Sequence, residues 1–185
     1  GIGGVGKTAL MMKLVWDSIQ EDPNRFNHYL ILTSKGKDQG TLKLLPGKTM
    51  VANKFNERST IAKYFESYSS FIKSIAEMNT YFDPKNAEYN LDSLTNYAIT
   101  ALQHDKILLV IDNFEDFEHG NSDYPQFKEF FDRFKSLVRP DSRIIITTRG
   151  DGKIAKNPKT LFALKPVDTA SLFVKRILWL RQKEH

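Results

Sequence analysis

The chain has 185 residues, of which 41% are hydrophobic and 26% charged. This composition predicts about one folded domain and excludes a chain that is disordered throughout. The absence of cysteine excludes a disulfide framework and thiolate metal sites. A net charge of +5 permits nucleic-acid binding without favouring it, because a phosphate site alone also benefits from a positive field. No apolar run is long enough to span a membrane, so we expect no membrane partner.

The first eight residues, GIGGVGKT, fit the phosphate-loop pattern G-x-x-x-x-G-K-[ST] at every fixed position. Glycines let the backbone turn tightly, so that its N–H groups point at an anion beside a helix N-terminus. Lys7 can place its charge on the β- and γ-phosphates, and the Thr8 hydroxyl can bind a phosphate-bound Mg²⁺. We therefore predict an ATP or ADP site formed by Gly1, Gly3, Gly4, Val5, Gly6, Lys7, Thr8 and Ala9.

The elements behind this loop predict an α/β domain. A phosphate loop normally follows a buried strand, and because nothing precedes Gly1 we expect the first strand of the sheet to be missing or cut. Apolar residues at helical spacing predict a helix over residues 7–20, and the run HYLILT predicts a buried strand over 28–33. A strand, a helix and a second strand around a phosphate loop begin a parallel sheet.

Residues 34–58 are rich in Gly, Pro and Lys and predict a long loop or small hairpin. This stretch is either a solvated insertion or a basic loop that contacts phosphates or a partner. Residues 59–78 carry a broad apolar stripe that predicts one helix, and Asn90 is expected to cap another helix that extends to about residue 103. We treat 35–89 as an insertion or extended loop-helix region within a nucleotide-binding domain of residues 1–165.

The second half of the chain alternates strands and helices. The run ILLVID predicts a fully buried parallel strand over 106–112, and phenylalanines three and four apart predict a helix over 122–137. Residues 143–148 predict another strand. A weaker strand is expected over 160–164, followed by a helix that starts near Asp168 and leads out of the domain over residues 166–185.

Three side chains complete the predicted chemistry. Asp112 ends a buried strand at the carboxyl edge of the sheet, where it can hold Mg²⁺ opposite Thr8; the alternative is a turn or helix-capping role. Glu115 is the better candidate to orient the attacking water, because Asn113 cannot act as a base; the alternative is a solvated carboxylate. Arg149, directly after the strand over 143–148, can reach the γ-phosphate, although an arginine there is often only solvated. We predict Lys7, Glu115 and Arg149 as the catalytic set.

The motifs GIGGVGKTAL, ILLVIDNFED and SRIIITTR together resemble the nucleotide-binding domain of STAND ATPases, in particular the bacterial-type NB-ARC branch. The resemblance implies a three-layer P-loop NTPase fold of the ASCE type with a mainly parallel sheet in the order 2-3-1-4-5. It also implies that Thr8 and Asp112 serve Mg²⁺ and that Arg149 senses the γ-phosphate. Asn113 departs from members of the family that have two adjacent acids, and this leaves the hydrolysis rate open.

The resemblance further implies a cytoplasmic signalling or defence switch that holds ADP at rest and self-associates when it binds ATP. Slow ATP hydrolysis to ADP and phosphate would reset this switch, and effector and sensor domains would lie outside the segment. The alternative is an AAA+-like motor or loader that acts on nucleic acid through the basic residues 35–54. A small-molecule kinase is a further alternative, although no lid with catalytic arginines is evident.

Overall fold

The structure is a computed structural model, and it describes residues 6–34, 59–79, 81–83, 85, 89–118 and 120–150. The predicted strand over 160–164 and the helix after Asp168 lie outside these ranges, as do the phosphate-loop residues 1–5 and the basic stretch 35–58. No helix in the described part is long and apolar enough to cross a membrane.

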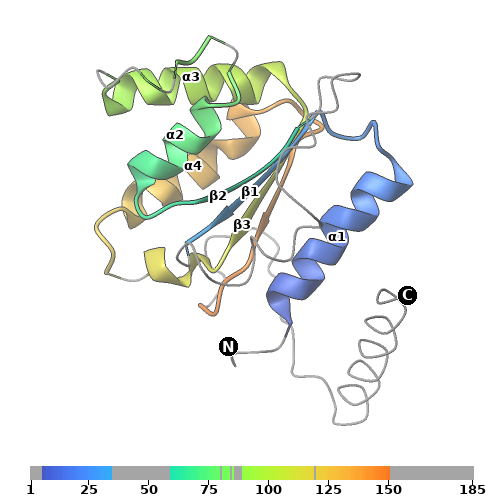
Figure 1. The fold of residues 1–185 in the computed structure, drawn as a ribbon. Helices are drawn as coiled ribbons and strands as arrows, with labels where there is room; N and C mark the ends of the chain where they lie inside the picture. The colour runs from blue at the N-terminus through green and yellow to red at the C-terminus, as the bar shows by residue number, and fades with distance from the viewer. Residues whose placement is uncertain are drawn as a thin grey trace.

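A four-stranded parallel sheet is at the centre of the described residues (Figure 1). Its strands are β1 (His28–Thr33), β2 (Ser59–Tyr64), β3 (Ile107–Asp112) and β4 (Arg143–Ile146), in the spatial order β2-β1-β3-β4. The helices are α1 (Lys7–Glu21), α2 (Tyr68–Ala76), α3 (Leu91–His104) and α4 (Tyr124–Leu137), with the short 3₁₀ helix η2 (Phe114–Phe117) after β3. The α/β class and the parallel sheet predicted from the sequence are confirmed.

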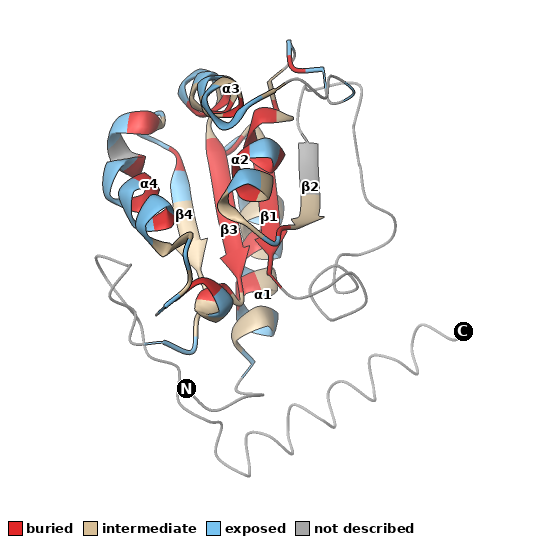
Figure 2. Cartoon of the chain, turned by 90° about the vertical axis from the view of Figure 1, so that its left-hand side faces the viewer, coloured by how far each residue is buried: buried red, intermediate tan, exposed pale blue. Residues whose placement is uncertain are grey.

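Helices cover both faces of this sheet. The α1 helix packs on one face through Met11 and Val15, which meet Ile31 of β1 and Val110 of β3. The α2, α3 and α4 helices cover the other face, where Leu30, Leu32, Leu109 and Ile111 point toward them. Successive residues of a strand alternate between its two faces, so β1 and β3 supply both cores and are buried along their length (Figure 2).

The predicted strand order is wrong at one position. The order 2-3-1-4-5 counts the strand expected before Gly1 as strand 1, residues 28–33 as strand 2, residues 106–112 as strand 3 and residues 143–148 as strand 4. It would therefore place strand 1 between residues 106–112 and 143–148. In the structure β3 and β4 pair directly, with Leu108 opposite Arg143 and Ile111 opposite Ile146. Paired strands lie only about 4.8 Å apart, so no strand fits between them.

The predicted single helix over 59–78 is also wrong in its first part. Residues 59–64 form the edge strand β2, which pairs in parallel with β1, and the Phe65 N–H extends the ladder by donating to the Thr33 carbonyl at 3.0 Å. The helix begins only at Tyr68, after a reciprocal capping box between Ser67 and Ser70. The apolar spacing of 61, 64, 65 and 68 suits a helix, but pairing with the open edge of β1 determines the structure of the first six residues.

Candidate functional site

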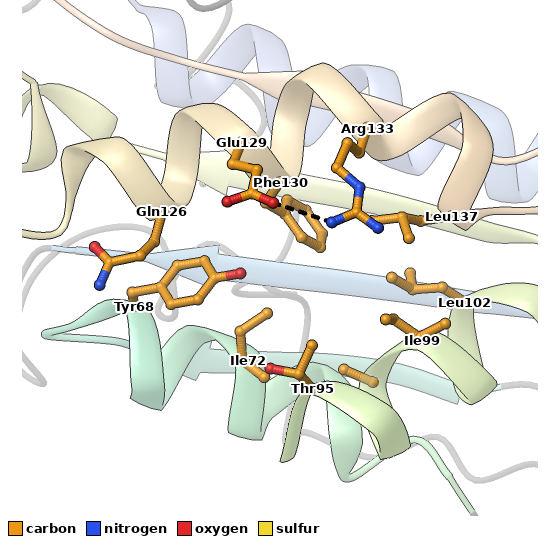
Figure 3. Close-up of a pocket in the computed structure, with 11 residues that line it drawn as sticks. Tyr68, Ile72, Thr95, Ile99, Leu102, Gln126, Glu129, Phe130, Arg133 and Leu137 are labelled. Atoms are coloured by element: carbon orange, nitrogen blue, oxygen red, sulfur yellow. Dashed lines mark hydrogen bonds and ion pairs between the residues drawn. The ribbon is translucent and has the colours of Figure 1, made fainter. Parts of the chain in front are cut away.

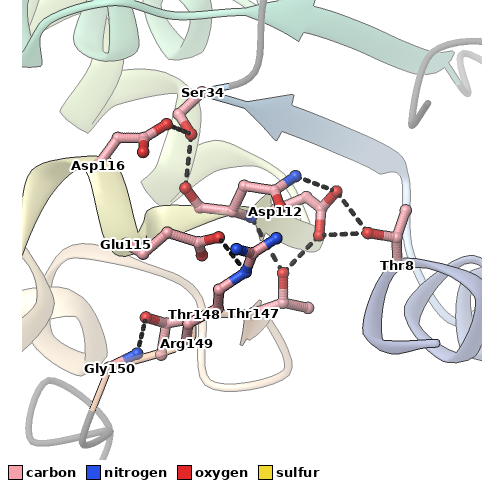
Figure 4. A network of polar contacts seen from close by, with 10 residues as sticks. Thr8, Ser34, Asp112, Glu115, Asp116, Thr147, Thr148, Arg149 and Gly150 are labelled. Atoms are coloured by element: carbon pink, nitrogen blue, oxygen red, sulfur yellow. Dashed lines mark hydrogen bonds and ion pairs between the residues drawn. The ribbon is translucent and has the colours of Figure 1, made fainter. Parts of the chain in front are cut away.

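Most of the polar residues selected from the sequence meet at one edge of the sheet, where β1, β3 and β4 end and α1 begins (Figure 4). Thr33 is opposite Asp112 in the register of β1 and β3, and Thr147 follows directly after β4. Parallel strands end at a common edge, so residues more than a hundred positions apart come together there.

The start of α1 has the features of an anion site. Gly6 caps it in the left-handed region, at φ 83° and ψ 17°, which favours glycine. No side chain caps this helix start, and its first turn carries no acidic residue. Helix-starting N–H groups lack intrahelical partners and attract anions. Lys7 and Thr8 are half-buried in the first turn, while Ala9 is exposed.

The predicted Mg²⁺ pair is in contact. The Thr8 hydroxyl lies 3.0 Å from Oδ1 and 2.9 Å from Oδ2 of Asp112, close enough to donate to either oxygen. Asp112 is completely buried. A buried carboxylate is tolerated when other groups replace its water, and Asp112 accepts hydrogen bonds from three side chains: Thr8, Asn113 and Thr147.

These groups fit a magnesium ion. Mg²⁺ takes oxygen ligands, and proteins usually hold it with one or two carboxylates while phosphate oxygens and waters fill the other positions. The Asp112 carboxylate and the Thr8 hydroxyl supply hard oxygens side by side. No group of three or more His, Cys, Asp or Glu side chains that could hold a metal ion occurs among the described residues.

The turn after Asp112 is held by the end of β4. Thr147 contacts β3 and the turn after it through both its backbone and its side chain. Its backbone N–H donates to the Ile111 carbonyl at 2.8 Å, and its backbone carbonyl accepts from the Phe114 N–H at 2.9 Å. Its hydroxyl accepts from the Asn113 N–H at 3.0 Å and donates to the Asp112 carboxylate. The sequence analysis did not foresee this role, although a polar residue directly after an apolar run was the feature that could have indicated it. The isoleucines of β4 are only partly buried.

The two other predicted catalytic residues form an ion pair. Arg149 Nε lies 3.1 Å from Glu115 Oε1, without the alignment of a hydrogen bond. The Glu115 side chain is 17% exposed and that of Arg149 45% exposed. Each charge therefore compensates the other. The solvated alternative does not describe Glu115, whereas Arg149 is exposed as well as paired.

Ser34 is a further residue that the sequence analysis missed. It follows β1 directly and is buried, and its hydroxyl lies within hydrogen-bond distance of the Asn113 carbonyl and, at 2.9 Å, of Asp116 Oδ2. It therefore ties the end of β1 to the turn after β3.

A cavity of about 190 Å³ lies away from this edge, between α2, α3 and α4 (Figure 3). Its floor is apolar, and Tyr68, Glu129 and Arg133 stand at its rim. Burial and the nearby Glu129 raise the pKa of Tyr68. Glu129 and Arg133 form an ion pair with an N–O distance of 3.0 Å. Their opposite charges cancel, so this pair would not attract a phosphate group to the cavity. The strand-end site is the better candidate for chemistry because it combines a helix start, a lysine and a buried carboxylate.

Comparison of the chain with protein-family models, with curated proteins and with solved structures finds no match.

Proposed function

We propose that this chain binds ATP and ADP with Mg²⁺ and acts as a nucleotide-dependent switch that hydrolyses ATP slowly. The single observation that carries the proposal is the contact between Thr8 and Asp112, which are 104 positions apart in the sequence. The sequence analysis paired the phosphate loop with the buried strand that ends in Asp, and the polar ends of these two elements meet. Such a contact is expected of a nucleotide site, in which the hydroxyl and the carboxylate together hold Mg²⁺.

Each residue has a definite part in this proposal. The backbone N–H groups at the start of α1 and the Lys7 ammonium would bind the β- and γ-phosphates. Thr8 and Asp112 would hold Mg²⁺, which when bound would offset the charge of the phosphate oxygens. Arg149 would detect the γ-phosphate, and Glu115 would orient the attacking water.

The ion pair between Glu115 and Arg149 favours slow turnover over rapid cycling. A carboxylate held in an ion pair must exchange its arginine partner for the attacking water before it can orient that water. Asn113 occupies the position next to Asp112 and cannot accept a proton as a carboxylate does. A slow hydrolytic step suits a switch, in which the lifetime of the ATP-bound state is the output.

The wider proposal rests on the motif resemblance to the STAND class. According to this wider proposal, the segment belongs to a cytoplasmic signalling or defence protein and self-associates in the ATP-bound state. It would respond to effector and sensor regions that lie outside the segment. The competing motor function depends on the basic residues 35–54, which lie outside the described ranges, so no structural observation favours it.

Nucleotide binding is the test. ATP and ADP would be titrated calorimetrically into the chain, with Mg²⁺ or with EDTA. Lys7→Ala should weaken ATP binding by roughly 10- to 150-fold, the loss expected for a hydrogen bond between charged groups. Lys13→Ala is the matched control, because Lys13 is an exposed lysine of the same helix whose partner is Asp17. Absence of ATP and ADP binding by the wild type would refute the proposal.

A second measurement separates the switch from its alternatives. The protein as purified would be denatured, the released nucleotide identified, and the turnover of added ATP followed. Retained ADP with turnover over minutes or longer supports the switch. Fast turnover that nucleic acid stimulates would replace it with the motor, and transfer of phosphate to a small acceptor would replace it with a kinase.

A further inference from the structure

The carboxylate of Asp112 is held on both of its oxygens. The Thr147 hydroxyl donates to Oδ1, and the Asn113 amide nitrogen donates to Oδ2 at 2.8 Å. The Thr8 hydroxyl lies almost equally far from the two oxygens. Two fixed donors, one for each oxygen, therefore set the plane of the carboxylate (Figure 4).

Asn113 reaches this position through an uncommon backbone conformation. Its φ of 60° and ψ of 44° lie in the left-handed region, and it is the only described non-glycine residue with a positive φ. Asparagine tolerates this region better than most residues, and a non-glycine residue there signals a local requirement. Here its side chain meets Asp112 while its N–H donates to the Thr147 hydroxyl. The backbone strain and the two hydrogen bonds thus belong to one arrangement.

We propose that Asn113 and Thr147 are positioning residues that orient the Asp112 carboxylate toward the Thr8 hydroxyl and thereby set the affinity of the site for Mg²⁺. This inference rests on the proposed nucleotide function. It deepens that function by giving Asn113 a task in metal binding, where the sequence suggested only the lack of a second acid.

Orienting donors would raise the affinity for Mg²⁺ because an unrestrained carboxylate can rotate about its terminal torsion. The terminal torsion of an Asp side chain has a broad, roughly two-fold preference, so an unrestrained group samples orientations unsuited to the ion. Outer groups that hydrogen-bond a metal ligand remove this freedom before binding, and their loss typically costs 10- to 100-fold in affinity or activity. The donors here are the residues directly after β3 and directly after β4, so the restraint is built into the sheet edge.

Thr147 also links the carboxylate to the proposed γ-phosphate sensor. It is two residues before Arg149 in the segment that leaves β4, and its hydroxyl contacts Asp112. If this segment moved when Arg149 bound a phosphate, the Thr147 side chain would transmit the movement to Asp112, the proposed magnesium ligand.

The test uses three variants of the chain and a fluorescent ATP analogue. Thr147→Val removes the hydroxyl at nearly constant shape, and Thr147→Ser keeps it. Asn113→Gly accepts the left-handed conformation and removes only the amide. Mg²⁺ would be titrated at a fixed concentration of analogue, analogue binding would be measured again in EDTA, and melting temperatures would be recorded without nucleotide.

We expect Thr147→Val and Asn113→Gly to raise the Mg²⁺ concentration at half-saturation by about tenfold or more. Thr147→Ser should stay close to the wild type, and all three variants should bind the analogue in EDTA as the wild type does. A purely structural role would instead lower the melting temperature and weaken binding equally with and without Mg²⁺, and that pattern would overturn the proposal.

An unchanged Mg²⁺ dependence in both Thr147→Val and Asn113→Gly would also overturn it, while leaving the proposed function intact. Failure of the wild type to bind the analogue with Mg²⁺ would remove the proposed function and this inference together. The two failures are therefore distinguishable from the wild-type titration alone.

Discussion

Asp112 shows how a few neighbouring groups determine the chemistry of a site. A carboxylate without contact to water is stable when hydrogen bonds replace its hydration, and three side chains provide them here. Glu115 is compensated differently, by the charge of Arg149. One carboxylate thus faces Thr8 while the other is paired with a cation; the first is the proposed metal ligand and the second the residue proposed to orient the attacking water.

Removal of the Arg149 side chain should reduce discrimination between ATP and ADP. In the proposed site only ATP offers this residue a γ-phosphate, so Arg149→Ala should weaken ATP binding by about tenfold or more while ADP binding changes little. Both affinities would be measured by calorimetry with Mg²⁺. Arg143→Ala is the matched control, because Arg143 is at the opposite end of β4 and donates to the Pro140 and Ser142 carbonyls. An unchanged ratio of the two affinities in Arg149→Ala would contradict the assignment.

At the scale of elements, the α2 region shows that a cap can outweigh a periodic pattern. Ser67 accepts from the Ser70 N–H at 3.2 Å, and the Ser70 hydroxyl accepts from the Ser67 N–H at 3.0 Å. This box satisfies N–H groups that no helical turn could reach, so the helix starts after Ser67 and residues 59–64 remain available to β1. The apolar stripe over residues 59–78 is therefore divided between the strand β2 and the helix α2 instead of forming one helix.

Loss of this cap should destabilise the chain measurably. Ser67→Ala is expected to lower the free energy of unfolding by about 1 kcal/mol, within the range of roughly 0.5–2 kcal/mol known for such caps. Urea titration followed by circular dichroism would measure it. Ser69→Ala is the control: Ser69 is an exposed residue inside the same helix, where alanine should be neutral or slightly stabilising. Equal unfolding midpoints for the two variants would show that the box contributes nothing.

At the scale of the whole described molecule, the two faces of the sheet carry unequal cores. The face under α1 buries a small cluster, whereas the face under α2, α3 and α4 buries a much larger one that is rich in phenylalanine. Phe71 is near its centre, with ring centroids 5.6 Å from Phe65, 5.1 Å from Phe127 and 5.2 Å from Phe130. Most of the hydrophobic stabilisation among the described residues therefore lies on the face that α1 does not cover.

Truncation of Phe71 should test this division. Phe71→Ala is expected to cost about 3–5 kcal/mol, because a fully buried ring is lost and a cavity remains. Tyr81→Ala, at a side chain that is 85% exposed, should stay within about 0.5 kcal/mol of the wild type. Denaturant unfolding would give both values. A small cost at Phe71 would mean that the larger cluster is not the main source of stability.

Local pattern was sufficient for much of the architecture. The predicted helices at the start of the chain, after Asn90 and over 122–137 correspond to α1, α3 and α4, and the runs HYLILT and ILLVID are the strands β1 and β3. Hydrophobic periodicity and length encode these elements, because each depends on residues close together in the chain. The same reasoning placed Thr8 and Asp112 at a common edge, since parallel strands share their carboxyl ends. The nucleotide and magnesium roles stay predictions.

Tertiary structure decided what depends on pairing between distant segments. The direct contact of β3 with β4, the strand at 59–64, the Glu115–Arg149 ion pair and the Thr147 hydrogen bonds all join residues whose proximity no local pattern records. The left-handed turn at Asn113 belongs with them, because its N–H donates to the Thr147 hydroxyl, a partner that only the assembled sheet brings near. The sequence by itself determined most of the polar residues of the candidate site, and strand register determined how they are held, because hydrogen-bond partners at a sheet edge are fixed only when the strands pair.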